Sequence, residues 1–160
     1  MNKLGFTLIE LLVVIGIIST LLLIGVGALT SYYRIQTFNV GVADVVTTLQ
    51  TAKSYAQSQV VKQCPSDEFQ GYKVSFTVTT VELREVCKTA VPSALETKTM
   101  HKDLSIIPPS SPITFKALTG NVEPSGKTTL ITVKGYNRCQ TININTAGSI
   151  YIDPAVVSCP

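Results

Sequence analysis

A long apolar segment near the N-terminus constrains this chain more than any other feature of its sequence. The run LLVVIGIISTLLLIGVGAL extends from Leu11 to Leu29, and Ser19 and Thr20 are its only polar residues. No charged residue lies between Glu10 and Arg34. Because about 20 apolar residues in a helix span the roughly 30 Å of a bilayer core, the segment is long enough to cross a membrane.

The composition of the chain fits one small domain in addition to this segment. Of the 160 residues, 45% are hydrophobic and only 14% are charged, whereas an average soluble protein has about 25% charged residues. These values exclude a disordered chain and a coiled-coil rod, and they argue against an ordinary cytosolic enzyme. The net charge of +3 is too small to indicate a protein that coats nucleic acid.

Three roles are open to the apolar segment: a cleaved secretory signal, a plain membrane anchor, and an anchor that later packs against copies of itself. Small residues at Gly25, Gly27 and Ala28 would suit a signal peptidase. Glu10 argues against the first two roles, because a carboxylate inside an apolar helix costs about 3 kcal/mol. Neither a signal peptide nor a simple anchor gains anything from that cost.

A positive partner would make Glu10 tolerable in the membrane. A cut between Gly5 and Phe6 would create an α-amino group on Phe6, four residues before Glu10 and on the same helix face. At about 4 Å and an effective dielectric near 20, such a pair is worth at most about 4 kcal/mol, which is comparable with the cost of burial. The amine could pair with Glu10 of its own chain or of an adjacent one, and a pairing between chains would set their axial register.

The residues around Glu10 also resemble a known family. The run KLGFTLIE from Lys3 to Glu10, followed by LLVVIGII, resembles the class III signal of type IV pilins and pseudopilins. This resemblance implies that a prepilin peptidase removes residues 1–5 after Gly5, that Phe6 becomes the N-methylated terminus, and that Glu10 guides subunit docking. The expected partners are this peptidase, other pilin or pseudopilin subunits, and the inner-membrane assembly platform.

The same resemblance implies a location. We expect a single-pass protein of the inner membrane, with residues 6–30 as the transmembrane and assembly helix. The globular domain, residues 31–160, is expected on the periplasmic or extracellular side and later in a filament.

One long helix is predicted for the first part of the chain. All eight prolines lie at Pro65 or later, so a helix can extend from Phe6 to about Val61. Its second half carries apolar residues at spacings of three or four, which predicts one stripe that packs on a core. The residues of this stripe are Ile35, Phe38, Val42, Val46, Leu49, Ala52, Ala56 and Val60.

Strands are predicted after Cys64, where the composition changes to threonine, valine and isoleucine with frequent turn residues. The predicted strands are 72–78, 81–86, 104–107, 113–117, 129–134, 140–145 and 149–152. Short links at 135–138 and 146–148 predict an antiparallel meander for the last three, and Pro108, Pro109 and Pro112 predict a corner. The fold class is therefore α+β with a pilin-like architecture, in which a long N-terminal helix packs on an antiparallel sheet.

Several short segments of this half resemble one subgroup, the H-type pseudopilins and FimT-like minor pilins. They are LQTAKSYA at 49–56, ITF at 113–115, INI at 142–144 and GSI at 148–150. Two features depart from the subgroup: its members usually have arginine where Lys53 stands, and many lack these cysteines.

Four cysteines, Cys64, Cys87, Cys139 and Cys159, lie after the apolar segment, on the side expected to be oxidising. They have no CxxC spacing and no histidine nearby in sequence, which argues against zinc and thioredoxin-like chemistry. Of the three possible connectivities we favour Cys64 with Cys87 and Cys139 with Cys159. If strand 149–152 runs back along 140–145, the chain returns toward Cys139, where a bridge would hold the tail. A closing bridge near the C-terminus is also common in pilins.

The sequence offers few residues for catalysis. His101 lies in a polar segment, Asp67 and Glu68 follow a proline in a predicted loop, and Asp153 precedes Pro154 in a predicted turn. No phosphate-binding loop, nucleophile elbow or metal-ligand spacing is present in the sequence. We therefore expect no catalytic residues, no cofactor and no metal, and a structural protein instead of an enzyme.

Nucleic-acid binding is a further possibility for a chain that resembles this family, because some minor pilins serve DNA uptake. Lys127, Lys134 and Arg138 fall around one predicted hairpin, and together with Lys116, if it lies nearby, they could contact phosphates. Lysine at a sheet edge equally deters strand pairing, and the terminal run IDPAVVSCP carries no basic residue. We therefore do not expect nucleic acid as a partner. The alternatives kept open are a DNA-binding minor pilin for DNA uptake and a monomeric membrane-anchored domain.

Overall fold

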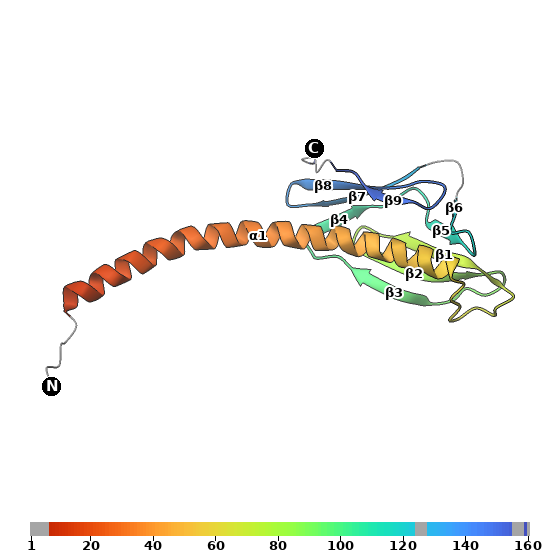
Figure 1. Ribbon diagram of the computed structural model, residues 1–160, viewed down its shortest axis with the longest axis horizontal. Helices are drawn as coiled ribbons and strands as arrows, with labels where there is room; N and C mark the ends of the chain where they lie inside the picture. Colours follow the sequence, from red (N-terminus) through yellow and green to blue (C-terminus); the bar gives the residue numbers. More distant parts are fainter. Residues whose placement is uncertain (1–6, 124–127, 155–158, 160) are drawn as a thin grey trace, which may run out of the picture. The chain divides into compact units, whose positions relative to one another are not determined.

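The computed structural model describes residues 7–123, 128–154 and 159, which fall into two compact units, Met1–Gln36 and Thr37–Pro160. Helix α1, Leu8–Gln57, begins in the first unit and ends in the second (Figure 1). The described strands all follow the helix in sequence, which confirms the expected α+β class. They are β1 Phe69–Phe76, β2 Thr80–Cys87, β3 Ala94–Thr99, β4 Leu104–Ile107, β5 Ile113–Lys116, β6 Val122–Glu123, β7 Thr129–Gly135, β8 Arg138–Ile144 and β9 Ile150–Ile152.

The strands form two antiparallel sheets, where the sequence predicted one. The first sheet has the order β3-β2-β1-β5-β6 and the second the order β4-β7-β8-β9. The separation arises at the prolines at 108, 109 and 112, which lie between β4 and β5 and cannot continue a strand ladder. Backbone hydrogen bonds still join the sheets, from the Ile106 N–H to the Val78 carbonyl and from the Val122 N–H to the Thr146 carbonyl.

The predicted meander is confirmed, and two strands were missed. β7 pairs with β8 and β8 with β9, all antiparallel. β3 was missed because its residues ALETKT show no alternation of apolar and polar side chains, and none of them is fully buried. β6 was missed because it has only two residues. The first predicted strand, 72–78, is displaced, since β1 begins and ends earlier.

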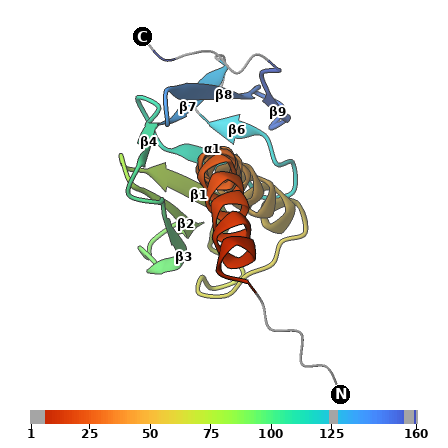
Figure 2. The ribbon, with the colours of Figure 1, turned by 90° about the vertical axis from the view of Figure 1, so that its left-hand side faces the viewer.

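The core of the second unit lies between α1 and both sheets. Figure 2 shows the sheets along two adjacent sides of the helix. Val45 and Thr48 are buried although the predicted stripe omitted them, whereas the predicted Ile35 is 37% exposed. The observed stripe keeps alternating steps of four and three, so that its side chains stay on one helix face: Phe38, Val42, Val45, Leu49, Ala52 and Ala56.

Helix α1 ends at Gln57, four residues before the predicted end. Gln59 has a φ of 51°, which lies in the left-handed region, and the N–H of Val60 donates to the carbonyl of Tyr55 at 3.1 Å. This six-to-one hydrogen bond across a left-handed residue is the Schellman arrangement that closes a helix. The apolar periodicity continues through Val60, but the backbone has already turned.

Candidate functional site

Thr7 caps the N-terminus of helix α1, which begins at Leu8. The N–H of Glu10 donates to the Thr7 carbonyl at 3.1 Å and to the Thr7 Oγ1 at 3.3 Å. A threonine side chain at this position satisfies a backbone donor of the first helical turn, and a carboxylate in that turn interacts favourably with the helix dipole. Glu10 itself is exposed. Gly5 and Phe6, predicted to flank the scissile bond, lie outside the described residues.

The most apolar part of α1 has no buried residue. Its most apolar window of 18 residues has a mean hydropathy of 2.7 and is 0% buried. Leu8 is 81% exposed and Leu21 is 64% exposed. An apolar surface of this size is stable only against lipid or against other apolar helices. Among the described residues, this is the one helix long and apolar enough to cross a membrane.

The hydroxyl groups of this segment bond to the helix backbone. Ser19 donates to the Ile15 carbonyl at 2.8 Å, and Thr20 donates to the Ile17 carbonyl at 2.8 Å. Such bonds suit a membrane, because lipid offers polar groups no hydrogen-bonding partner. Within the described helix residues before Arg34, Glu10 is the one charged residue.

Two tyrosines follow the apolar segment. Tyr32 and Tyr33 are 62% and 60% exposed, their ring centroids are 6.4 Å apart, and Arg34 comes next in the chain. Tyrosine is enriched where a transmembrane helix leaves the apolar core of the bilayer, because its ring is apolar and its hydroxyl is polar. A tyrosine pair directly after the apolar segment is therefore what a membrane span ending near Tyr33 would require.

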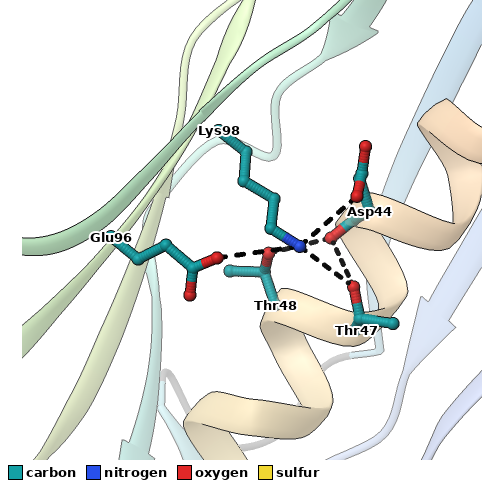
Figure 3. Close-up of polar contacts among 5 residues, drawn as sticks. All are labelled: Asp44, Thr47, Thr48, Glu96 and Lys98. Atoms are coloured by element: carbon teal, nitrogen blue, oxygen red, sulfur yellow. Dashed lines mark hydrogen bonds and ion pairs between the residues drawn. The ribbon is translucent and has the colours of Figure 1, made fainter.

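A lysine of the edge strand β3 connects that strand to α1 (Figure 3). The Lys98 ammonium lies 3.3 Å from the Asp44 carboxylate, 3.3 Å from the Thr47 hydroxyl and 3.7 Å from the Glu96 carboxylate. The Asp44 carboxylate is partly exposed, so the ion pair contributes at most about 1 kcal/mol. Its main effect is to fix where a strand with little buried surface lies against the helix.

A buried carboxylate anchors the segment that follows α1. Glu85, on β2, is 2% exposed. Its Oε2 accepts hydrogen bonds from the N–H groups of Gln63 and Cys64, each at 2.8 Å, and its Oε1 accepts one from the N–H of Lys62 at 2.6 Å. The Tyr72 hydroxyl lies 3.1 Å from Oε1 and 2.5 Å from the Val60 carbonyl. Four residues of the turn after the helix are therefore held by two side chains of the sheet.

These contacts shift the pKa values of both groups. Burial alone would raise the pKa of Glu85, but the N–H groups of Cys64, Gln63 and Lys62 together with the Tyr72 hydroxyl outweigh it, so that this pKa lies below its ordinary value. Burial, and then the negative charge of Glu85, raise the pKa of the Tyr72 hydroxyl. At neutral pH the pair is thus a carboxylate and a protonated phenol.

Both disulfides of the structure are the ones favoured from the sequence. Cys64 is bonded to Cys87 with 5.6 Å between the Cα atoms, and Cys139 is bonded to Cys159 with 5.3 Å between them. The first bridge joins the anchored turn to β2. The second joins the start of β8 to a residue near the C-terminus, as expected if β9 runs back along β8.

Of the remaining candidates, Lys134 and Arg138 lie on the two sides of the hairpin between β7 and β8, whereas Lys116 lies on β5 of the other sheet. His101 is exposed and lies 3.6 Å from the Asp103 carboxylate, and Lys116 pairs with Glu123 at 2.6 Å. Lys127, considered for phosphate contact, lies outside the described residues. Within residues 7–123, 128–154 and 159 there is no group of three or more His, Cys, Asp or Glu side chains placed to hold a metal ion.

Sequence reasoning missed Glu85 and Lys98. Glu85 had a usable signal, because it alternates with Val81, Leu83 and Cys87 on the buried face of β2. An acidic residue at a buried position requires hydrogen-bond donors from elsewhere in the chain. Lys98 had no such signal, since nothing in the sequence places β3 beside Asp44.

The fold and the exposed helix define an α+β, pilin-like architecture, with one candidate membrane anchor in the described part of the chain. Residues 1–26 match the family described as the prokaryotic N-terminal methylation motif. The chain therefore carries the N-terminal segment of a type IV pilin-like substrate of prepilin peptidase, which confirms the predicted resemblance to type IV pilins and pseudopilins. Comparisons with curated proteins and with solved structures give no match. The H-type subgroup stays a prediction.

Proposed function

We propose that this chain is a structural subunit, a minor pilin or pseudopilin, of a type IV pilus or a type II secretion filament. Prepilin peptidase cleaves after Gly5, Phe6 is methylated, and the mature subunit assembles through its N-terminal helix. Glu10 pairs with the amine of Phe6, in the same chain or in a neighbouring subunit, and sets the axial register of adjacent helices.

One observation carries this proposal: the most apolar window of the helix has no buried residue, and the helix carries a single carboxylate close to its start. When such a helix moves from lipid into a bundle of helices, the hydrophobic effect contributes little, because both surroundings are apolar. Packing and polar pairs then drive association. Glu10 is the charged residue able to supply such a pair in this part of the helix.

The second unit supports the proposal because its core does not depend on the apolar segment. The buried residues of the core cluster all lie at Phe38 or later among the described residues. The first half of α1 can therefore exchange lipid for neighbouring subunits without opening that core. Two disulfides cross-link the unit independently of the helix.

The proposal is tested with Glu10→Ala in the full chain, co-expressed with a type IV pilus or type II secretion assembly system. The membrane-extracted fraction reports insertion and the sheared filament fraction reports assembly. We expect unchanged insertion and a filament fraction reduced at least about tenfold, which corresponds to the loss of about 1.4 kcal/mol per subunit.

Asp67→Ala is the matched control, because Asp67 is an exposed carboxylate in the turn after Pro65. It should leave both fractions at wild-type levels. Glu10→Ala subunits that assemble as well as wild type would contradict the docking role. A wild-type chain that inserts, retains residues 1–5 and never enters a filament would favour the monomeric membrane-anchored alternative.

A further inference from the structure

Three cations lie at one end of the second unit. Lys102 is in the turn between β3 and β4, Lys134 is near the end of β7, and Arg138 begins β8. The pairing of Lys134 with Ser105 on β4 makes the turn before β4 a neighbour of the hairpin between β7 and β8. The Tyr136 hydroxyl of that hairpin donates to the Asp103 carboxylate at 3.1 Å and joins the two segments.

These cations, which we name the basic end, have no carboxylate partner among the residues that the structure describes. In the part of the chain that the structure describes, Lys102, Lys134 and Arg138 form no ion pair within 4.0 Å. Arg84, Lys98 and Lys116, in contrast, pair with carboxylates at 2.8, 3.3 and 2.6 Å. Among the described residues, Asp103 is the carboxylate that these contacts place at the basic end, so the three cations there outnumber the carboxylates.

The basic end adjoins the residues at which α1 enters the second unit. A Cβ atom on Gly41 would clash with the side chain of Leu104 and would lie 3.7 Å from the Met100 sulfur, so the helix contacts the turn that contains Lys102. Phe38, a buried residue at the start of the second unit, follows Tyr33 by five residues.

Chain length therefore limits how far the basic end can be from the membrane. Five residues cover at most about 18 Å even when fully extended. If Tyr33 lies at the membrane interface, Phe38 stays close to the headgroup region for any orientation of the first half of the helix. Electrostatic attraction to a charged membrane surface decays over about 10 Å at 0.1 M salt. This decay length is of the same order as the largest separation that the five residues allow, so the membrane charge can act on the basic end.

We propose that Lys102, Lys134 and Arg138 bind anionic phospholipid headgroups of the membrane that holds the N-terminal helix. The proposal rests on the proposed function for the insertion of that helix. The surface holds the globular unit against the membrane while the subunit waits for assembly. Entry into a filament removes the subunit from the bilayer and breaks these contacts.

The test uses the full chain in nanodiscs of phosphatidylcholine alone or with phosphatidylglycerol added. Backbone hydrogen exchange is measured for peptides that cover 100–104 and 134–138. In 0.1 M salt we expect exchange to be at least about fivefold slower in the anionic discs. A factor of this size is expected when one lysine or arginine binds at a charged membrane surface. High salt should remove the difference.

The variant K102Q/K134Q/R138Q should lose this lipid dependence. The matched control K53Q/K73Q/K88Q removes the same charge from positions outside the basic end and should keep it. Equal exchange of the wild type in both lipids, or retention of the difference by the first variant, would overturn the inference. Slower exchange caused by added duplex DNA in uncharged discs, with no response to anionic lipid, would overturn it in favour of a nucleic-acid surface.

Association with the discs separates the two proposals. A wild-type chain that fails to insert overturns the proposed function and this inference together. A chain that inserts but shows no dependence on lipid charge overturns the inference alone and leaves the proposed function standing.

Discussion

The carboxylate of Glu85 accepts a 2.8 Å hydrogen bond from the N–H of Cys64, whose sulfur is bonded to Cys87 on the same strand as Glu85. Strand β2 thus holds the turn after the helix in two ways, one covalent and one polar. Because this turn follows Gln57, the two contacts fix how the C-terminal end of α1 continues into the first sheet.

Replacing Glu85 by glutamine should destabilise the second unit. Glutamine offers one oxygen where glutamate offers two, so its NH₂ group must face two of the backbone or hydroxyl donors that now bond to the carboxylate. We expect Glu85→Gln to lower the free energy of unfolding by about 2 to 3 kcal/mol, measured by urea denaturation of the detergent-solubilised chain.

Glu82→Gln is the control for this change. Glu82 lies on the same strand and pairs with Arg84 at 2.8 Å, but both side chains are partly exposed. Its replacement should cost less than about 1 kcal/mol. Equal effects of the two substitutions would show that the contacts of Glu85 contribute no more than a surface pair.

Stability should fall in acid because of Glu85. Its pKa in the folded chain is below the ordinary value of 4.5, so the carboxylate stabilises the fold fully above about pH 4.5. This contribution is lost as the pH decreases through the folded-state pKa, where protonation removes acceptors for the surrounding N–H groups. Thermal unfolding between pH 2 and pH 7 should show a steeper acid decline for wild type than for Glu85→Gln, and parallel profiles would contradict this assignment.

The disulfide and Glu85 should act together on the turn. Removal of Cys64–Cys87 by a double serine substitution should lower the free energy of unfolding by about 3 kcal/mol, and removal of Cys139–Cys159 by a similar amount. Because Glu85 and the first bridge hold the same residues, their combined loss should exceed the sum of the separate losses by at least about 0.5 kcal/mol.

The second bridge is the matched control for that coupling. It lies at the other sheet, so its loss and Glu85→Gln should lower the free energy of unfolding by the sum of their separate effects. A double-mutant cycle by urea denaturation measures both combinations. Additive effects for Cys64–Cys87 would mean that the carboxylate and the bridge act on the fold separately.

The sequence was sufficient to predict those parts of the fold that depend on local pattern. The long helix follows from the absence of proline before Pro65, and the meander follows from alternating strands with short links. The bounds of the helix could not be predicted, because its end depends on the left-handed conformation of Gln59, a residue with no strong preference for that conformation. The division into two sheets depends on which strand meets β4, and local pattern does not contain that information.

In the candidate site, too, the sequence predicted what depends on local pattern and missed contacts between distant residues. Glu10 was predicted because a carboxylate in an apolar helix needs an explanation from the sequence alone. The contacts of Glu85 and Lys98 join residues far apart in the chain, 21 positions from Cys64 and 54 from Asp44, so no sequence spacing could indicate them. Their discovery required the folded structure.

The most direct test of the central claim is the mass of the N-terminus after exposure to prepilin peptidase. The full chain is incubated in membranes that contain an active peptidase, and then in membranes that contain an inactive one. We expect the active enzyme to release residues 1–5 and to leave a chain that begins at Phe6 and carries one added methyl group. A chain that still begins at Met1 in both membranes would contradict the account.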